Sequence, residues 1–426
     1  MKLAAVSISL IVLSLMAGRY SPAQEISPPK EPQSLASLLA ETERGNPQIQ
    51  AARQAWEAAK LTPTQVSTLP DPQIMVQHFS VGSPRPFAGY TNSDFAYIGL
   101  GFSQDIPYPG KLRLRGEIAK KDAELVQQQY EAVRKAVLRD FKEKYYRLAF
   151  LAKKDAILEN DRTLLGQVEQ AAEARYRTGS GSQQEVLQAQ LEQTRLLAEI
   201  TRNQLDASIA QAGLKQLLGR SQSSADLDPA PLAQTPLPYT YSQLLDAAKS
   251  NNPRIAGIQK TVERQNLQID LARKDFYPDF NVQYMWQRTD PSQFRAYYML
   301  TFGMRIPIYR SRKQKPELAQ AEVEKTRAQS EYETESQEVA AKLQQQFAAA
   351  EKSAELLKIY GDGLIPQARA ELQAGMAAYQ SNRQDFQALL SSFLDVLKLE
   401  QEYWQTMADR EATLAQIEET TGLSLR

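Results

Sequence analysis

The hydrophobic pattern of the chain changes its period at Ile106-Pro107. Before this dipeptide, at 97–106, large apolar residues occupy every second position, which is typical of a strand with one apolar face. After it, apolar residues recur at spacings of three and four, which is typical of a helix; they include Val126, Tyr130, Val133, Val137 and Phe141. The sequence therefore predicts a strand that leads into a long helix.

A second copy of this pattern follows 200 positions later, where Ile306-Pro307 marks the same change of period. Each copy also opens alike, because a Leu-Leu pair precedes Asn46-Pro47 in the first copy and Asn252-Pro253 in the second. Helical patterns flank each Asn-Pro. We interpret the chain as a duplication of one unit of short helices, two strands and a long helical hairpin.

These patterns divide the chain into a leader, two repeats and a linker. We expect a signal peptide at 1–23, a first repeat at 24–220, a linker rich in proline and serine at 221–239, and a second repeat at 240–426. The predicted strands are 72–81, 95–107, 279–288 and 295–307, and the predicted helical hairpins are 113–218 and 313–422. We also expect a kink at Gly361 to Pro366, because proline removes a helical hydrogen bond.

The N-terminus indicates export. Lys2, an apolar run at 3–17 and the small residues Ser21 and Ala23 are typical of a secretory signal cleaved after Ala23. The alternative is a membrane anchor, but the run is shorter than the ~20 residues that a spanning helix needs. The chain contains no cysteine, which excludes disulfides, thiolate metal sites and an N-terminal lipid anchor.

Composition narrows the function classes. The 50 basic and 50 acidic residues balance, which argues against a nucleic-acid partner. The chain has one histidine, His78, and shows no nucleophile motif, phosphate-binding loop or paired-histidine signature. We therefore expect no enzyme activity, no cofactor and no metal site.

The strands carry apolar side chains of the kind that face lipid. Strands of about ten residues cross a bilayer when they are tilted. Four strands cannot close a barrel, however, and an open sheet edge is not tolerated in lipid. A membrane location therefore requires several chains to share one barrel. The residues that we expect on the membrane-facing side are Leu100, Phe102, Val282, Tyr284, Trp286, Leu300 and Phe302.

The chain resembles the TolC-type outer membrane efflux family over nearly all of its mature length. The resemblance is carried by the Leu-Leu and Asn-Pro openings, the Ile-Pro dipeptides and four further motifs, namely Leu69-Pro70-Asp71-Pro72, Tyr277-Pro278-Asp279, Tyr176-x-x-Gly179 and Tyr379-x-x-Asn382. It implies a homotrimer whose twelve-stranded β-barrel lies in outer membrane lipid and continues as an α-helical barrel through the periplasm. It also implies docking to a periplasmic membrane-fusion adaptor and an inner-membrane transporter of the RND or ABC type.

The resemblance further implies two functions for the tip of the hairpins. The adaptor is expected to dock at the turns formed by Thr178, Gly179, Ser180, Gly181, Ser381 and Asn382. A periplasmic gate is expected to link Glu185 to Tyr379 and Arg383, although Arg383 lies one position from its aligned place. The family's constriction carboxylates align with Ala388 and Ser391, so Asp385 and Asp395 are the nearest acids.

The sequence leaves other functions open. The conduit could serve small molecules or metal ions, or it could be the channel of type I protein secretion. A periplasmic coiled-coil structural protein with a small soluble sheet is the alternative from another class. That alternative would leave Val282, Tyr284 and Trp286 facing water.

Overall fold

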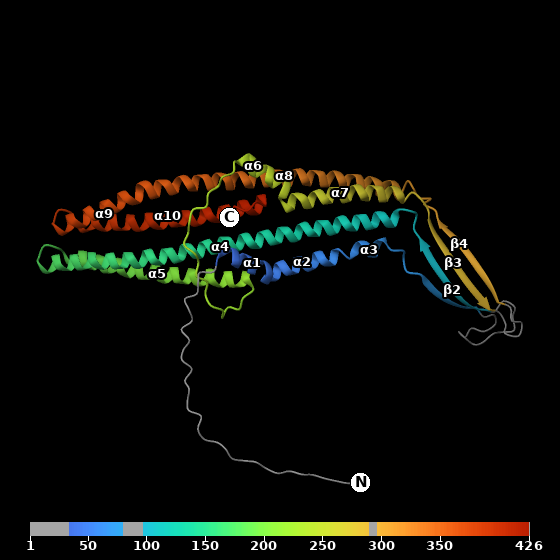
Figure 1. The fold of residues 1–426 in the computed structure, drawn as a ribbon, viewed down its shortest axis with the longest axis horizontal. Helices are drawn as coiled ribbons and strands as arrows, with labels where there is room; N and C mark the ends of the chain where they lie inside the picture. The colour runs from blue at the N-terminus through green and yellow to red at the C-terminus, as the bar shows by residue number, and fades with distance from the viewer. Residues whose placement is uncertain (1–33, 80–96, 289–295, 426) are drawn as a thin grey trace, which may run out of the picture.

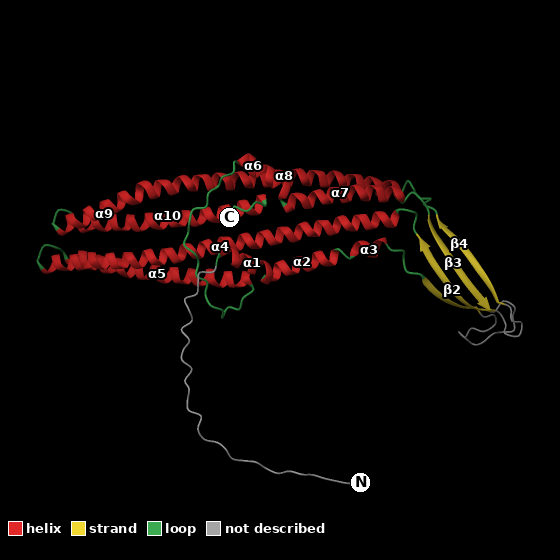
Figure 2. Cartoon of the chain, viewed as in Figure 1, coloured by secondary structure: helices red, strands yellow, loops and turns green. Residues whose placement is uncertain are grey.

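The structure, a computed structural model, describes residues 34–79, 97–288 and 296–425. Long helices lie side by side, and one sheet stands at one end of them (Figure 1). The turns that join the longest helices lie at the opposite end (Figure 2). The longest helix, α4 (Lys111–Arg177), has 67 residues, and at ~1.5 Å per residue it extends about 100 Å.

The two repeats have the same order of elements. The first contains α1 (Leu35–Gly45), α2 (Pro47–Ala59), α3 (Thr62–Ser67), β1 (Gln73–Phe79), β2 (Tyr97–Ile106), α4 and α5 (Gln183–Leu218). The second contains α6 (Tyr241–Asn251), α7 (Pro253–Lys274), β3 (Asp279–Arg288), β4 (Ala296–Arg305), α8 (Gln314–Lys358), a π-helix η1 (Ile359–Leu364), α9 (Ile365–Gln380) and α10 (Phe386–Thr421).

The four strands form one antiparallel sheet in the order β1-β2-β3-β4. Strand β2 of the first repeat pairs with β3 of the second, so the sheet joins the repeats. Strands β1 and β4 lie at the two edges of the sheet.

One face of the sheet is apolar and exposed. The pairing places Leu100 opposite Trp286 and Phe102 opposite Tyr284, and Tyr284 in turn lies opposite Leu300. Val282 and Phe302 also face each other, so all the residues predicted to face the membrane share one side of the sheet. Phe302 at the edge is 74% exposed. Exposed apolar patches of this kind mark contact with a partner or a membrane.

The opposite face of the sheet is packed and largely polar. Gly99 and Gly101 on β2 leave room for the side chain of Met285 on β3, and an added Cβ at Gly101 would lie 2.8 Å from it. Met285 and Gln287 are buried as a result. This face is therefore packed at the centre of the sheet, around Met285 and Gln287, while its residues on the edge strand β4, among them Tyr297 and Met299, are exposed.

Helix α4 organises the helical part. It packs against α5 of its own repeat and against α7 and α10 of the other repeat. One core fills the half nearer the hairpin turns, where Leu158, Leu165 and Phe393 are buried. A second core lies around Phe141 and Tyr145 at mid-height, and a third joins α6, α8 and α10 around Leu343.

The duplicated Asn-Pro motif has one structural function in both repeats. Asn46 caps α2 through its side-chain oxygen, and its amide donates to the carbonyl oxygen of Leu217 at 2.9 Å. Asn252 caps α7 in the same way and donates to Thr420 at 2.9 Å. Each motif therefore fixes the bend between two short helices to the end of the returning long helix.

Some sequence expectations differ from the structure or lie outside it. The signal peptide and parts of the predicted strands at 80–81, 95–96 and 295 fall outside the described residues. Where a kink is expected, at Gly361 to Pro366, the helix changes to a π-helix, η1, which runs directly into α9 with Pro366 in its first turn. None of the described helices is both long and apolar enough to cross a bilayer.

Candidate functional site

The site expected from the sequence is the pair of turns at the end of the hairpins. In the first turn, α4 ends at Arg177, and Gly179 adopts a positive φ of 73°. Asn382 takes the corresponding position in the second turn with a φ of 64°, which asparagine tolerates better than most residues. Thr178, Ser180 and Ser381 are also exposed, so both turns present small polar residues to solvent.

The start of each returning helix is capped. Ser182 accepts a hydrogen bond from the Glu185 backbone at 3.3 Å, and Glu185 Oε1 accepts one from the Ser182 backbone at 3.4 Å. This capping box satisfies two free backbone donors of α5. Asp385 caps α10 by accepting from the backbone of Ala388 at 2.7 Å. The carboxylate of Asp385 is therefore engaged in local structure.

Tyr379 and Glu185 join the two hairpins. The Tyr379 hydroxyl donates to Glu185 Oε2 at 2.7 Å, while Oε1 of the same carboxylate serves the cap. Tyr379 is only 1% exposed, and its ring packs edge-on against Phe386 at 5.9 Å. Burial, and after it the Glu185 carboxylate, raises the pKa of the Tyr379 hydroxyl. The hydroxyl therefore stays protonated and acts as a donor.

Arg175 is the arginine that contacts Tyr379, and the sequence analysis did not single it out. Its guanidinium lies over the Tyr379 ring, 4.2 Å from the centroid, and Nη1 donates to the Tyr379 carbonyl at 3.0 Å. Nη2 donates to the Ser180 carbonyl at 3.1 Å and to Asn382 Oδ1. One side chain therefore holds both turns together.

The remaining predicted residues lie apart from this contact. Arg383 is exposed on the second turn, while Tyr379 is held by Arg175. Ala388, Ser391 and Asp395 lie exposed along one side of α10, at spacings of three and four residues. The structure thus brings Glu185 and Tyr379 together and leaves Arg383 free to meet solvent.

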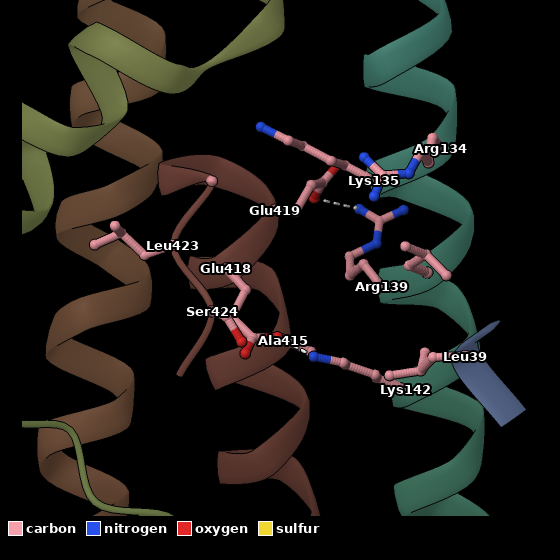
Figure 3. Close-up of a pocket in the computed structure, with 12 residues that line it drawn as sticks. Leu39, Arg134, Lys135, Arg139, Lys142, Ala415, Glu418, Glu419, Leu423 and Ser424 are labelled. Atoms are coloured by element: carbon pink, nitrogen blue, oxygen red, sulfur yellow. Dashed lines mark hydrogen bonds and ion pairs between the residues drawn. The ribbon is translucent and has the colours of Figure 1, made fainter. Parts of the chain in front are cut away.

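A cavity of about 300 Å³ lies higher up, between α4 and the end of α10. Figure 3 shows four cations of α4 that line it, namely Arg134, Lys135, Arg139 and Lys142. Arg139 pairs with Glu419 at 3.0 Å, and Lys142 pairs with Glu418. Lys135 donates to the Asn251 carbonyl at 2.9 Å, and its pKa is lowered by burial. Ion pairs from α4 to α10 and the Lys135 hydrogen bond to Asn251 therefore join the two repeats at this cavity.

The described residues contain no group of three or more histidine, aspartate or glutamate side chains placed to hold a metal ion. The contacts observed at the tip are hydrogen bonds and a cation–π contact. These can open and close without a change in any covalent bond.

Comparison with known proteins decides the family. The sequence profile of the family described as "Outer membrane efflux protein" matches residues 38–220 and 244–419, one match on each repeat. The chain belongs to this family. The fold class, the outer membrane location with an extension into the periplasm and the absence of an enzyme role are thereby confirmed. A search of curated proteins gave no match.

Solved structures of several channels share the fold of this efflux protein. CusC has 18% sequence identity and a TM-score of 0.79, with 92% of this chain and 93% of CusC covered. VceC from Vibrio cholerae has 16% identity and a TM-score of 0.77, with 92% and 97% covered. MtrE from Neisseria gonorrhoeae, solved in an open state, has 16% identity and a TM-score of 0.77, with 92% and 89% covered.

Proposed function

We propose that three copies of this efflux protein form the outer membrane channel of a tripartite export system. A periplasmic adaptor binds at the hairpin turns, and an inner-membrane transporter supplies the energy and chooses the cargo. The observation that carries the proposal is the exposed apolar face of a sheet with two free edges, attached to helices of about 100 Å. Because the hydrocarbon core is only ~30 Å thick, these helices extend far into the periplasm.

The two sheet edges support self-assembly. Unpaired backbone groups on β1 and β4 are costly in lipid, so β4 of one copy needs β1 of another. Twelve strands from three copies match the barrel expected for the family.

The helices support the same assembly. Helix α5 lies at one side of the protomer and carries exposed Leu187, Leu191, Leu205 and Ile209. Apolar residues at spacings of four on an exposed helix need a partner helix. A neighbouring copy provides one, because α8 lies at the other side of the protomer (Figure 1).

The cargo we propose is a small molecule or metal ion. The described tip carries no group built for one cargo, which fits a passive conduit whose pump selects. Type I protein secretion remains the second candidate. A periplasmic structural protein is disfavoured because it leaves Tyr284, Trp286 and Phe302 in water.

We also propose that the Tyr379–Glu185 contact is part of a gate. It ties α9 to α5 at the level of the turns, where the helices must narrow to stop leakage. Hydrogen bonds to charged groups contribute about 1.5–3 kcal/mol each. Three symmetric copies therefore bias the channel towards the closed state, and Arg175 strengthens this bias by holding both turns.

The proposal is tested by native mass measurement and by conductance in planar bilayers. We expect a trimer from detergent and a small single-channel conductance. Glu185→Ala combined with Tyr379→Phe is expected to raise the conductance. The matched control is Ser182→Ala, which removes the α5 cap but keeps the tyrosine contact.

Each outcome bears on one part of the proposal. A stable soluble monomer would contradict the channel. A trimer whose double variant conducts like the parent would keep the channel and exclude these residues from the gate. An equal rise for Ser182→Ala would attribute the effect to loss of the cap.

A further inference from the structure

A buried ion cluster joins the repeats where the sheet meets the helices. Lys111, the first residue of α4, pairs through Nζ with Asp275 and Asp279, both at 2.9 Å. The backbone of Tyr108 donates to Asp279 Oδ1 at 2.8 Å. The Lys111 side chain is only 4% exposed. We call this set, together with Tyr277, the junction clamp.

Aromatic rings complete the junction clamp. Tyr108 and Tyr277 stack with their centroids 4.6 Å apart. Lys274 Nζ lies 5.4 Å from the Tyr108 centroid and 5.9 Å from the Tyr277 centroid. The segment after β2 is thus fixed to the segment before β3 by charge and by ring contact.

The duplication leaves the two halves of a second clamp at opposite edges of the protomer. Leu69-Pro70-Asp71 before β1 corresponds to Tyr277-Pro278-Asp279 at the start of β3. Asp71 and Leu69 are exposed. The segment after β4 corresponds to the segment after β2, and there Tyr309 is 68% exposed.

The segment after β4 also carries the cations for such a clamp. The side chains of Arg312 and Lys313 are exposed, and within the described part of the chain neither side chain has a hydrogen-bonded or ion-pair partner; the same holds for the carboxylate of Asp71. Arg310 differs, because it donates to the carbonyl of Pro307 at 3.3 Å and of Phe276 at 3.4 Å. Six residues separate Pro307 from Gln314, against three between Pro107 and Lys111, so this segment is the longer of the two.

We propose that Asp71 of one copy binds Arg312 and Lys313 of the next copy, with Leu69 against Tyr309, as an intersubunit junction clamp. The partner is a second copy of this chain, and the inference rests on the proposed trimer. The charges are complementary. Because Ser67 stands where the second repeat has Asp275, one carboxylate faces two cations, whereas in the junction clamp one cation faces two carboxylates.

Strand pairing brings the two halves together. Within the protomer, Ile106 at the end of β2 lies opposite Phe280 at the start of β3. The same register between copies places Ile306 opposite Pro72 and Thr301 opposite Gln77. The free cations then arrive beside Asp71, as Lys111 arrives beside Asp279.

The clamp has a mechanical consequence for the channel. Junction clamps and intersubunit clamps would alternate around the trimer, so each point at which a strand leads into a helix is held in place. Movement of the helices at the tip then leaves the barrel end in place.

Cross-linking tests the inference because the natural chain has no cysteine. Asp71→Cys combined with Arg312→Cys should form disulfide-linked dimers and trimers on mild oxidation. Asp71→Cys combined with Ser330→Cys is the control, since Ser330 is exposed on α8, the helix that follows Arg312, about 25 Å further along. Gln77→Cys combined with Thr301→Cys reports strand closure by itself.

Charge exchange is the second readout. Asp71→Lys alone, or Arg312→Glu with Lys313→Glu, should dissociate the trimer at a temperature at which the parent stays intact. Combining the three substitutions should restore at least part of that loss, and Asp71→Asn should give an intermediate loss without a repulsive charge.

The outcomes separate the inference from the proposed function. A strand cross-link without a junction cross-link, or charge variants without rescue, overturns the clamp while the trimer stands. Absence of both cross-links together with a monomer in native mass measurement overturns the proposed function itself. Junction cross-linking with rescue supports the clamp.

Discussion

Asp161 is a buried carboxylate between the two hairpins, and its removal should stabilise the protein in a pH-dependent way. It lies on α4 and is 8% exposed, and its Oδ2 has no hydrogen-bond partner among the described residues. Glu199 on α5 and Glu400 on α10 face it. Burial first, then Glu400 and Glu199, raises the pKa of Asp161 from 3.8 to about 7, and Arg369 opposes the rise.

The magnitude follows from the size of this pKa shift. One pKa unit corresponds to about 1.4 kcal/mol, so a rise of roughly three units corresponds to about 4 kcal/mol. Below pH ~4 the carboxyl is protonated in both the folded and the unfolded state, and folding carries no cost. The cost grows as the pH rises from about 4 to about 7, and it is complete above pH ~7.

The perturbation is Asp161→Asn, which keeps the shape and removes the charge. We expect it to raise the free energy of unfolding at pH 8 by up to about 4 kcal/mol and to have little effect at pH 4. The assay is urea unfolding in detergent, followed by far-ultraviolet circular dichroism, at pH 4, 6 and 8. Glu159→Gln on the exposed side of the same helix is the control.

Two results would refute this reasoning. A variant that gains the same stability at pH 4 and pH 8 would show that the charge of Asp161 is not the cause. A variant that loses stability at pH 8 would show that the Asp161 carboxylate makes a favourable contact. That contact would then be stronger than the repulsion from Glu199 and Glu400.

Three further predictions concern other parts of the chain. Tyr284→Arg should destabilise the protein in the membrane by about 2–4 kcal/mol, whereas Gln283→Arg on the opposite face of the sheet should be tolerated. Equal losses of stability for the two variants in detergent-to-lipid folding assays would show that the apolar face does not contact lipid. Ser180→Trp should abolish adaptor binding in pull-down without affecting the trimer; Gly181 is unsuitable because Arg175 lies 3.0 Å from an added Cβ. Asn46→Ala should lower the free energy of unfolding by about 1–2 kcal/mol through loss of the α2 cap, with chemical denaturation as the measurement.

The sequence predicted the fold because each local pattern of residues favours the same element that the folded chain has at that position. The change of period at Ile106-Pro107 and Ile306-Pro307 locates the change from strand to helix in both repeats. The Asn-Pro motifs locate the bends, because asparagine caps and proline starts a helix well. Each of these signals depends on a few adjacent residues.

The parts that the sequence could not supply depend on residues far apart in the chain. Arg175 contacts Tyr379, which lies 204 positions away, and only the meeting of two turns brings them together. Its one local signal is a cation in the last turn of α4, which Arg177 shares. The proline and glycines at 361–366 predicted an irregularity at this place, but the sequence does not show that it takes the form of a π-helix, which depends on the hydrogen-bond pattern of the folded helix.

These features assign different mechanical roles to the two ends of the protein. The junction clamp fixes the sheet end through a buried lysine and two carboxylates. The tip half has its own hydrophobic core, and beside it lie the π-helix at 359–364 and the Asp161 carboxylate, whose Oδ2 has no hydrogen-bond partner among the described residues. π-Helices often lie at functional sites in helices. In the proposed gate, the hairpins are linked at the turns by the hydrogen bond from Tyr379 to Glu185 and by the hydrogen bonds of Arg175 to Tyr379 and Asn382. We therefore expect opening of the channel to begin at the tip, with helix displacements that decrease towards the sheet.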